Sequence, residues 1–297
     1  MNRYRLYWIL LLLTLTVYAG VGWSEQQLAG GWIDGFDGPA EAYTLERGGE
    51  AIAVAVYLPV YVGDRIQAAE GHVLKIGKSD GTVLSIDHSI GIFTIEEADQ
   101  PATALGNFLQ WAGSWFERYV DSTQTDSMVS SMVSRGEKGP PISMSLFPTG
   151  QARMLAGNRT IALYWDGGEP PFGLVLRGRE ASDPLLKVDG IDQGRTSIGP
   201  LDFQVGTYYL EVSDTDEVEI VRIDVVTDDS FPARPAEMQD AGMPNEVLNN
   251  LEAMWLAGQG DGEWVLEGYQ RVADSRNEQT AARLLRQALE EGIAPTP

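Results

Sequence analysis

Side chains that carry out most enzymatic chemistry are scarce in this chain. The sequence has no cysteine, and its 2 histidines are His72 and His88. Asp87, His88 and Ser89 together supply the three residue types of a serine-hydrolase triad. Adjacent residues cannot form such a triad, because its side chains converge from different elements. We therefore predict that the chain is not an enzyme and has no catalytic residues.

Acidic side chains are the second possible source of chemistry. Asp214, Asp216, Glu217 and Glu219 lie close together, and carboxylate oxygens are preferred calcium ligands. The stretch lacks the Asp-x-Asp-x-Asp-Gly loop and a matching distal glutamate, so we interpret it as a solvated turn. No Walker loop or dinucleotide fingerprint occurs. We expect neither a metal nor a cofactor.

The overall charge excludes some classes of partner. The chain has 21 Lys and Arg against 43 Asp and Glu, for a formal charge of -22. Such an acidic protein is not expected to bind nucleic acid or anionic lipid headgroups. Without cysteine, neither a disulfide framework nor a thiolate zinc site is possible.

The first residues are typical of a targeting segment. Arg3 and Arg5 precede an uncharged stretch, and Ala19 fits a small-residue cleavage site. Residues 1–24 are therefore predicted to be a signal peptide or an N-terminal membrane anchor. Both alternatives predict a periplasmic or exported protein, inner-membrane anchored by residues 6–24 if the segment stays uncleaved. We expect contact with a membrane only in that uncleaved case.

Short strands with tight turns are expected between residues 58 and 95. The pairs Gly63-Asp64 and Asp80-Gly81 interrupt runs of strand-forming residues, and we predict that they form turns. Ala51–Tyr57 is expected to be a strand buried on both faces, and Glu25–Gly38 a lead-in segment. The spacing favours a compact all-β unit.

This stretch resembles the FecR-like domain of bacterial envelope proteins. The matching residues are Gly63, Asp64, Ile66, Asp80, Gly81 and Phe93, and the resemblance covers about residues 38–99. It implies sensing or relay across the envelope through contacts with another envelope protein. Only about five residues precede the apolar N-terminal stretch, so we do not expect the chain itself to hold a sigma factor.

An amphipathic helix is predicted over residues 105–120. Phe108, Trp111, Trp115 and Tyr119 recur at spacings of three and four and so share one face. The stripe is expected to pack on the preceding β-unit, which would make residues 38–120 one domain. The alternative is a surface for a partner or ligand, for which Trp111, Trp115 and Trp165 are the candidates.

The rest of the chain is expected to hold a linker, a second β-unit and a helical segment. Residues 121–141 are rich in Ser, Asp, Gly and Pro and are predicted to be a linker. Residues 142–226 contain seven strand candidates, which favours an immunoglobulin-like β-sandwich with Tyr208 or Tyr209 as a corner tyrosine. Residues 243–292 show helical periodicity in three short segments, which are expected to form a small bundle.

The predicted fold class is therefore mainly β with helical additions. We predict a non-catalytic exported envelope protein that acts through protein contacts as a sensing, relay or scaffold module. Two alternatives stay open: a glycan-binding or surface-adhesion module, and an envelope-polymer enzyme of unrecognised type. Exposure of Trp111, Trp115 and Trp165 in a line would favour the glycan-binding alternative.

Overall fold

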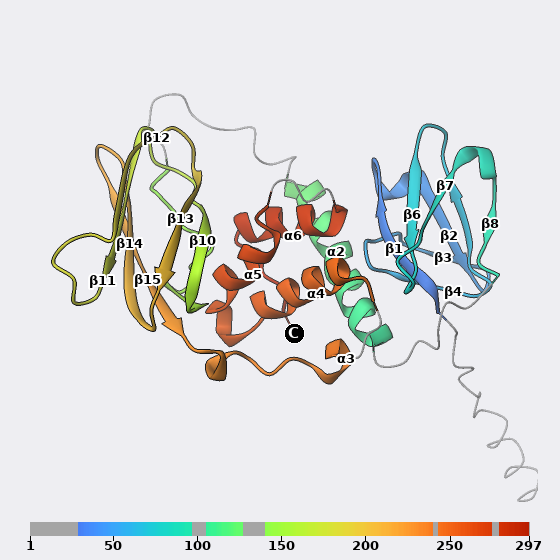
Figure 1. The fold of residues 1–297 in the computed structure, drawn as a ribbon. Helices are drawn as coiled ribbons and strands as arrows, with labels where there is room; N and C mark the ends of the chain where they lie inside the picture. The colour runs from blue at the N-terminus through green and yellow to red at the C-terminus, as the bar shows by residue number, and fades with distance from the viewer. Residues whose placement is uncertain (1–28, 97–104, 127–139, 240–242, 275–278, 297) are drawn as a thin grey trace, which may run out of the picture.

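The fold is mainly β with helical additions, as the sequence predicts. The computed structural model describes residues 29–96, 105–126, 140–239, 243–274 and 279–296. Two β-units lie at the ends of the molecule, and a group of helices lies between them (Figure 1). The predicted signal peptide or anchor and residues 127–139 of the predicted linker fall outside the described residues.

The first β-unit consists of two four-stranded sheets. One has the strand order β4-β1-β6-β7 and the other β3-β2-β5-β8. The strands are β1 (Ala29–Phe36), β2 (Tyr43–Arg47), β3 (Glu50–Ile52), β4 (Pro59–Tyr61), β5 (Arg65–Ala68), β6 (Val73–Gly77), β7 (Val83–Asp87) and β8 (Phe93–Thr94). Their inward side chains form a separate core that includes Ile33, Leu45, Ile66 and Ile86.

Two predictions for this unit are wrong. The segment expected to be a lead-in contains β1, which lies between β4 and β6 in its sheet. Its three glycines remove the pattern of strand-forming residues by which a strand is predicted from sequence. A Cβ at Gly31 would lie 2.4 Å from the Gly77 carbonyl oxygen, so the close strand contact requires glycine. The expected strand Ala51–Tyr57 is limited to β3, which ends at Ile52. Tyr57 is not extended: it has a left-handed φ of 65° and donates its N–H to the Ile33 carbonyl at 2.7 Å.

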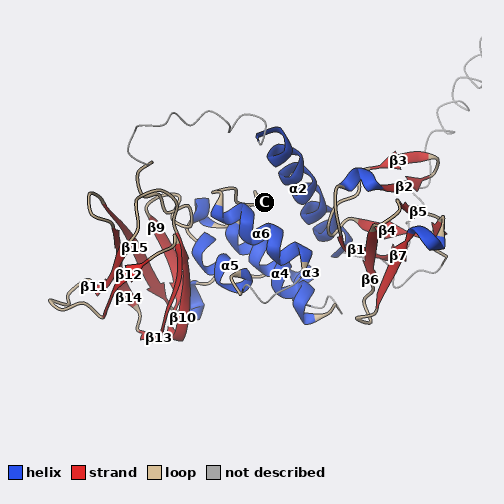
Figure 2. Cartoon of the chain, turned by 90° about the horizontal axis from the view of Figure 1, so that it is seen from above, coloured by secondary structure: helices blue, strands red, loops and turns tan. Residues whose placement is uncertain are grey.

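Helix α2 (Leu105–Asp126) is longer than the predicted 105–120 and continues into the expected linker. Trp115 and Tyr119 of its aromatic stripe are buried, whereas Phe108 and Trp111 are half-buried. The neighbouring Phe116 is also buried and lies edge-on to Tyr57 at 5.9 Å. Gly113 permits a close approach, since a Cβ there would lie 3.1 Å from the Leu58 nitrogen. The helix lies beside the C-terminal helices, and one of its ends is close to the first β-unit (Figure 2).

The second β-unit is an immunoglobulin-like sandwich. Its strands are β9 (Gln151–Leu155), β10 (Gly157–Tyr164), β11 (Phe172–Gly178), β12 (Leu186–Ile191), β13 (Arg195–Phe203), β14 (Gly206–Ser213) and β15 (Val218–Val226). One sheet has the order β12-β11-β14-β15-β9, and β10 pairs with β13 in the other. The third, sixth and seventh strands are thus neighbours, and the second pairs with the fifth, as in immunoglobulin domains.

Tyr208 is the corner tyrosine of this sandwich. Its hydroxyl donates to the Gln204 carbonyl at 2.9 Å and accepts from the Gln204 N–H at 3.1 Å. The bond ties the start of β14 to the preceding corner, which is the position such a tyrosine takes in immunoglobulin-like folds.

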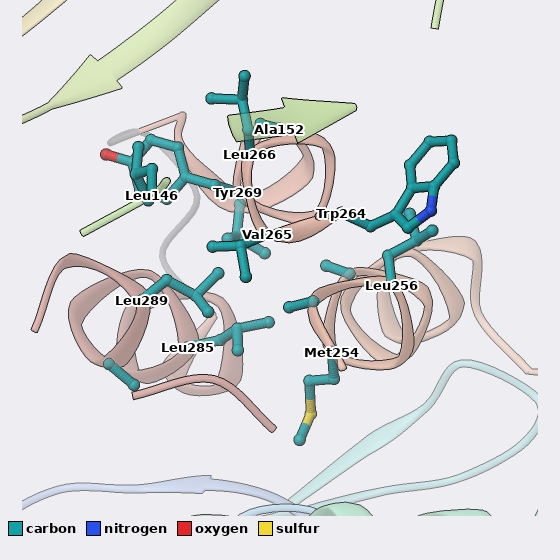
Figure 3. Close-up of a cluster of buried hydrophobic side chains, with 14 of the residues drawn as sticks. Leu146, Ala152, Met254, Leu256, Trp264, Val265, Leu266, Tyr269, Leu285 and Leu289 are labelled. Atoms are coloured by element: carbon teal, nitrogen blue, oxygen red, sulfur yellow. The ribbon is translucent and has the colours of Figure 1, made fainter. Parts of the chain in front are cut away.

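The C-terminal segment supplies the central helices. They are α3 (Ala236–Gln239), α4 (Asn245–Ala257), α5 (Val265–Val272) and α6 (Thr280–Glu290). Short 3-10 turns lie at Ala40–Ala42, His88–Ile90, Asp228–Ser230 and Gly260–Gly262. Side chains of α4, α5 and α6 point toward one another, and Leu146 and Ala152 of the sandwich region join them (Figure 3). The predicted bundle therefore has no core of its own but shares one with its neighbours.

Hydrogen bonds and an ion pair connect the central helices to both β-units. The Gln270 side chain accepts from the Ala162 N–H at 2.7 Å and donates to the Ala162 carbonyl at 3.0 Å, so α5 covers the open edge of β10. Buried Glu267 pairs with Arg159 of the sandwich at 2.9 Å. On the other side, Asn250 of α4 donates to the Tyr57 hydroxyl at 3.2 Å.

Candidate functional site

The three candidate tryptophans do not form an exposed line. Trp115 is 4% exposed and Trp165 is 1% exposed, and both belong to the main core. Trp111 is half-buried, and its indole N–H donates to the Thr296 carbonyl at 2.9 Å. The three rings therefore do not form one exposed surface. Trp115 packs on Phe116 and Tyr119, and Trp165 packs on Phe172 inside the sandwich.

Of the residues that carry the resemblance, the two Gly/Asp pairs lie in turns between strands, whereas Ile66 lies in β5 and Phe93 in β8. Gly63 and Gly81 have φ values of 92° and 84°, which favour glycine. The Asp80 carboxylate accepts from the Thr82 hydroxyl at 2.6 Å and from the Thr82 N–H at 2.8 Å, and these two bonds lower its pKa. Asp64 has a further role that the sequence did not indicate: it is buried and pairs with Arg47 at 2.8 Å.

Asp87, His88 and Ser89 form a local cap. The Asp87 carboxylate accepts from the Ser89 hydroxyl at 2.5 Å and from its N–H at 2.8 Å. These bonds hold the pKa of Asp87 below its usual value. Since Asp87 bonds Ser89 directly, the imidazole of His88 does not lie between them as a triad requires.

The sequence also contains a Gly-x-Ser-x-Gly pattern at Gly77–Gly81, the spacing of a nucleophile elbow. A nucleophile elbow needs a turn from strand to helix, whereas these residues join β6 and β7 in a hairpin. Register pairs Val73 with Asp87 at the other end of that hairpin, next to both histidines. Ser79 therefore lies roughly 15 Å from either imidazole, given about 3.3 Å per strand residue.

The acidic cluster forms the turn between β14 and β15. The Asp214 carboxylate accepts from the N–H groups of Asp216 and Glu217, each at 2.8 Å. Within the described part of the chain, no three His, Asp or Glu side chains are grouped as metal ligands would be. Nor does any helix there combine the length and hydropathy needed to cross a membrane.

The outer face of the five-stranded sheet carries the clearest exposed apolar surface. Outward positions of an antiparallel sheet that faces water are normally polar. Here Tyr209, Val218 and Ile220 occupy such positions and are 38%, 55% and 57% exposed. Register places Ile220 opposite Glu211 and Tyr209 opposite Arg222, so Tyr209 and Ile220 are diagonal neighbours. We call Tyr209, Val218 and Ile220 the outer-face patch.

Charged side chains border the outer-face patch. Arg222 pairs with Asp224 at 2.7 Å on β15, and Arg177 lies opposite Tyr209 on β11. An apolar centre with a charged rim is the usual composition of a protein interface. Although β9 at the edge of this sheet contacts α5, strands β11 and β14 lie on the side of the sandwich away from the helices (Figure 1). The exposure of the patch shows that no other described element covers it.

No protein-family model matches the chain, and a search of curated proteins finds no significant match.

Proposed function

We propose that this chain is an exported, non-catalytic protein of the bacterial envelope that acts through contacts with another envelope protein. The outer-face patch carries the proposal. Three exposed apolar side chains on one face, within a charged rim, have the composition of a surface that a partner covers. The partner is expected to be a folded protein that presents a complementary apolar patch.

The arrangement of the helices supports a scaffold, relay or sensing role. The main core runs from Trp32 of the first β-unit through α2 and α4–α6 to the sandwich. Two β-units joined by a shared core keep a fixed relation, unlike domains on a flexible linker. A contact made at the sandwich therefore also positions the first β-unit, whose resemblance to FecR-like domains motivates the envelope role.

Co-purification from an envelope extract tests the proposal. The wild type is compared with the Tyr209→Glu/Ile220→Glu double variant and with Val62→Glu, which alters an apolar residue 44% exposed on the first β-unit. We expect the wild type and Val62→Glu to retain the same envelope protein and the double variant to lose it. Equal retention by all three would refute the role of the patch, provided that circular dichroism shows each to be folded.

The export part of the proposal has its own measurement. Mass spectrometry of the protein from its native envelope should find a start near Gly20 if the N-terminal segment is cleaved. Recovery of the intact chain from the cytosol would contradict export.

A further inference from the structure

Two apolar and two charged side chains form a square on the outer face of the sandwich. Cross-strand register pairs Tyr209 of β14 with Arg222 of β15, and Glu211 with Ile220. All four side chains point away from the sandwich core, because the residues between them on each strand are buried in that core. Tyr209 and Ile220 thus occupy one diagonal of the square, and Glu211 and Arg222 occupy the other.

The square is complementary to a second copy of itself. A two-fold axis that lies in the plane of the sheet, along the Tyr209–Ile220 diagonal, turns a second copy face down on the first. The two residues on the axis then meet their own equivalents, so apolar side chains contact apolar side chains. The other diagonal is exchanged, so Glu211 of each copy lies opposite Arg222 of the other copy.

The other in-plane two-fold axes through the square are unfavourable. An axis along the strands or across them places each apolar side chain opposite a charged one. An axis along the Glu211–Arg222 diagonal places each charge opposite its own equivalent, and like charges in contact oppose association. Only the Tyr209–Ile220 axis therefore matches all four side chains. With about 4.8 Å between strands and about 3.3 Å per residue, the strands of the two copies then cross at roughly 70°, close to orthogonal sheet packing.

The charged diagonal has the capacity for these contacts. The residues directly opposite Glu211 on the two neighbouring strands are Val175 and Ile220, so neither can pair with its carboxylate. Arg222 binds Asp224 at 2.7 Å and 3.0 Å through two of its nitrogens. A guanidinium carries five N–H donors, so Arg222 keeps donors for a second carboxylate.

The area of this face suits a weak dimer. Five strands spaced at about 4.8 Å, with about six residues of about 3.3 Å each, give a face of roughly 500 Å². Two copies would bury roughly 1,000 Å², which is the lower limit for specific association. The formal charge of -22 makes two copies repel each other over most of their surface. Dimerisation is therefore expected to be reversible and to depend on the two ion pairs.

We propose that in the free protein a second copy of the chain covers the outer-face patch, in a two-fold dimer formed by the Tyr209 and Ile220 contacts and two reciprocal Glu211–Arg222 ion pairs. The second copy occupies the surface that an envelope partner is proposed to cover, so this assignment rests on the proposed function. The envelope partner and the second copy compete for the same side chains. Self-association thus regulates how much of the protein is available to the partner.

Sedimentation velocity of the purified protein, from about 1 to about 500 µM, measures self-association in the range expected for a small interface. Glu211→Arg and Arg222→Glu each reverse one charge of the square. Glu50→Arg makes the same change at an exposed glutamate of β3 and is the matched control. We expect the wild type and Glu50→Arg to dimerise equally. Each reversed variant alone should dimerise at least roughly tenfold more weakly, because both ion pairs become like-charge contacts.

An equimolar mixture of the two reversed variants tests the reciprocal pairing directly. In the mixed dimer, one pair joins the new arginine to the new glutamate, and the other is the original Glu211–Arg222 pair. Both contacts are again attractive. We therefore expect the mixture to dimerise about as tightly as the wild type, which would also show that both variants are folded.

Three results would overturn the dimer. The first is a wild type that stays monomeric at the highest concentration. That measurement contains no envelope protein, so it would leave the co-purification test of the proposed function unaffected. The second is a dimer that neither reversed variant weakens, which would place its interface elsewhere on the chain. The third is a mixture that associates no more tightly than either reversed variant alone, when circular dichroism shows both to be folded.

Discussion

Replacing Trp115 by alanine should destabilise the protein strongly, because this side chain sits where α2 meets the rest of the core. Its ring stacks on Tyr119 with centroids 5.6 Å apart and meets Phe116 edge-on at 5.1 Å. Truncation of a core tryptophan typically costs about 3–5 kcal/mol, and each aromatic pair contributes about 0.5–1.5 kcal/mol of that. We therefore expect the free energy of unfolding to fall by about 3–5 kcal/mol.

Urea denaturation followed by far-ultraviolet circular dichroism measures this effect without relying on tryptophan fluorescence, which the substitution itself changes. With a urea dependence of about 1–3 kcal/mol per molar, the midpoint should fall by at least about 1 M. Trp111→Ala is the control, because Trp111 is only half-buried and should cost less than half as much. A Trp115→Ala midpoint equal to that of Trp111→Ala would refute the assignment of the stripe to the core.

Three further substitutions test separate parts of the fold. Gly63→Val should lower the free energy of unfolding by about 1–3 kcal/mol through backbone strain alone, since the space around Gly63 is open. Gly63→Asn should cost less, because asparagine tolerates a positive φ. Thermal melting of the two variants and the wild type measures the difference. Glu267→Ala should lower the free energy of unfolding by about 3–5 kcal/mol, because it leaves Arg159 and Arg271 without their shared carboxylate. Glu267→Gln should lower it less. An alanine variant as stable as the glutamine variant would contradict the role given to these ion pairs. Asp34→Asn should stabilise the protein increasingly as pH rises from about 4 toward 7. The raised pKa of Asp34 means that the folded state binds this proton more tightly than the unfolded state does, so ionisation of Asp34 costs stability above the usual carboxyl pKa. The measurement is the difference in urea midpoint between Asp34→Asn and the wild type at about pH 4 and at about pH 7. An equal difference at the two pH values would contradict this reasoning.

The strands and helices of the second half could be predicted because local signals mark their ends. Gly167-Gly168 lies between β10 and β11, and Asp214–Glu217 lies between β14 and β15. The Asp189-Gly190 pair, in contrast, does not end a strand, because it lies within β12 at a break in the register with β11. Pro244 and Gly258 delimit α4, which spans Asn245–Ala257. These residues favour turns and helix ends through their own backbone conformation, so their effect can be predicted without knowing any contact that is distant in sequence.

What could not be predicted is which surfaces meet. A helical stripe indicates that a face is buried without indicating against what, so α2 could be expected on the first β-unit but not also beside Thr296. The same ambiguity made Trp165 a candidate surface residue although it packs edge-on to Phe172 in the sandwich core at 5.4 Å. A groove of about 740 Å³ between the first β-unit and the helices escaped prediction for a similar reason, since Trp32 and Gln279 are brought to it from opposite ends of the sequence.

The contacts that unite the molecule are those between residues most distant in sequence. Asn250 bonds Tyr57 across 193 positions, Trp111 bonds Thr296 across 185, and Tyr119 bonds Glu291 across 172. Each β-unit has inward-facing apolar residues from its own strands, so its two sheets can pack against each other before the helices pack on them. The groove wall and the buried face of α2, by contrast, require residues from the last fifth of the chain. Because closing such long stretches of chain costs conformational entropy, we expect the joint between the units to be the last part of the fold to form. The fixed relation of the two β-units, on which the proposed scaffold role depends, is therefore set by the C-terminal helices.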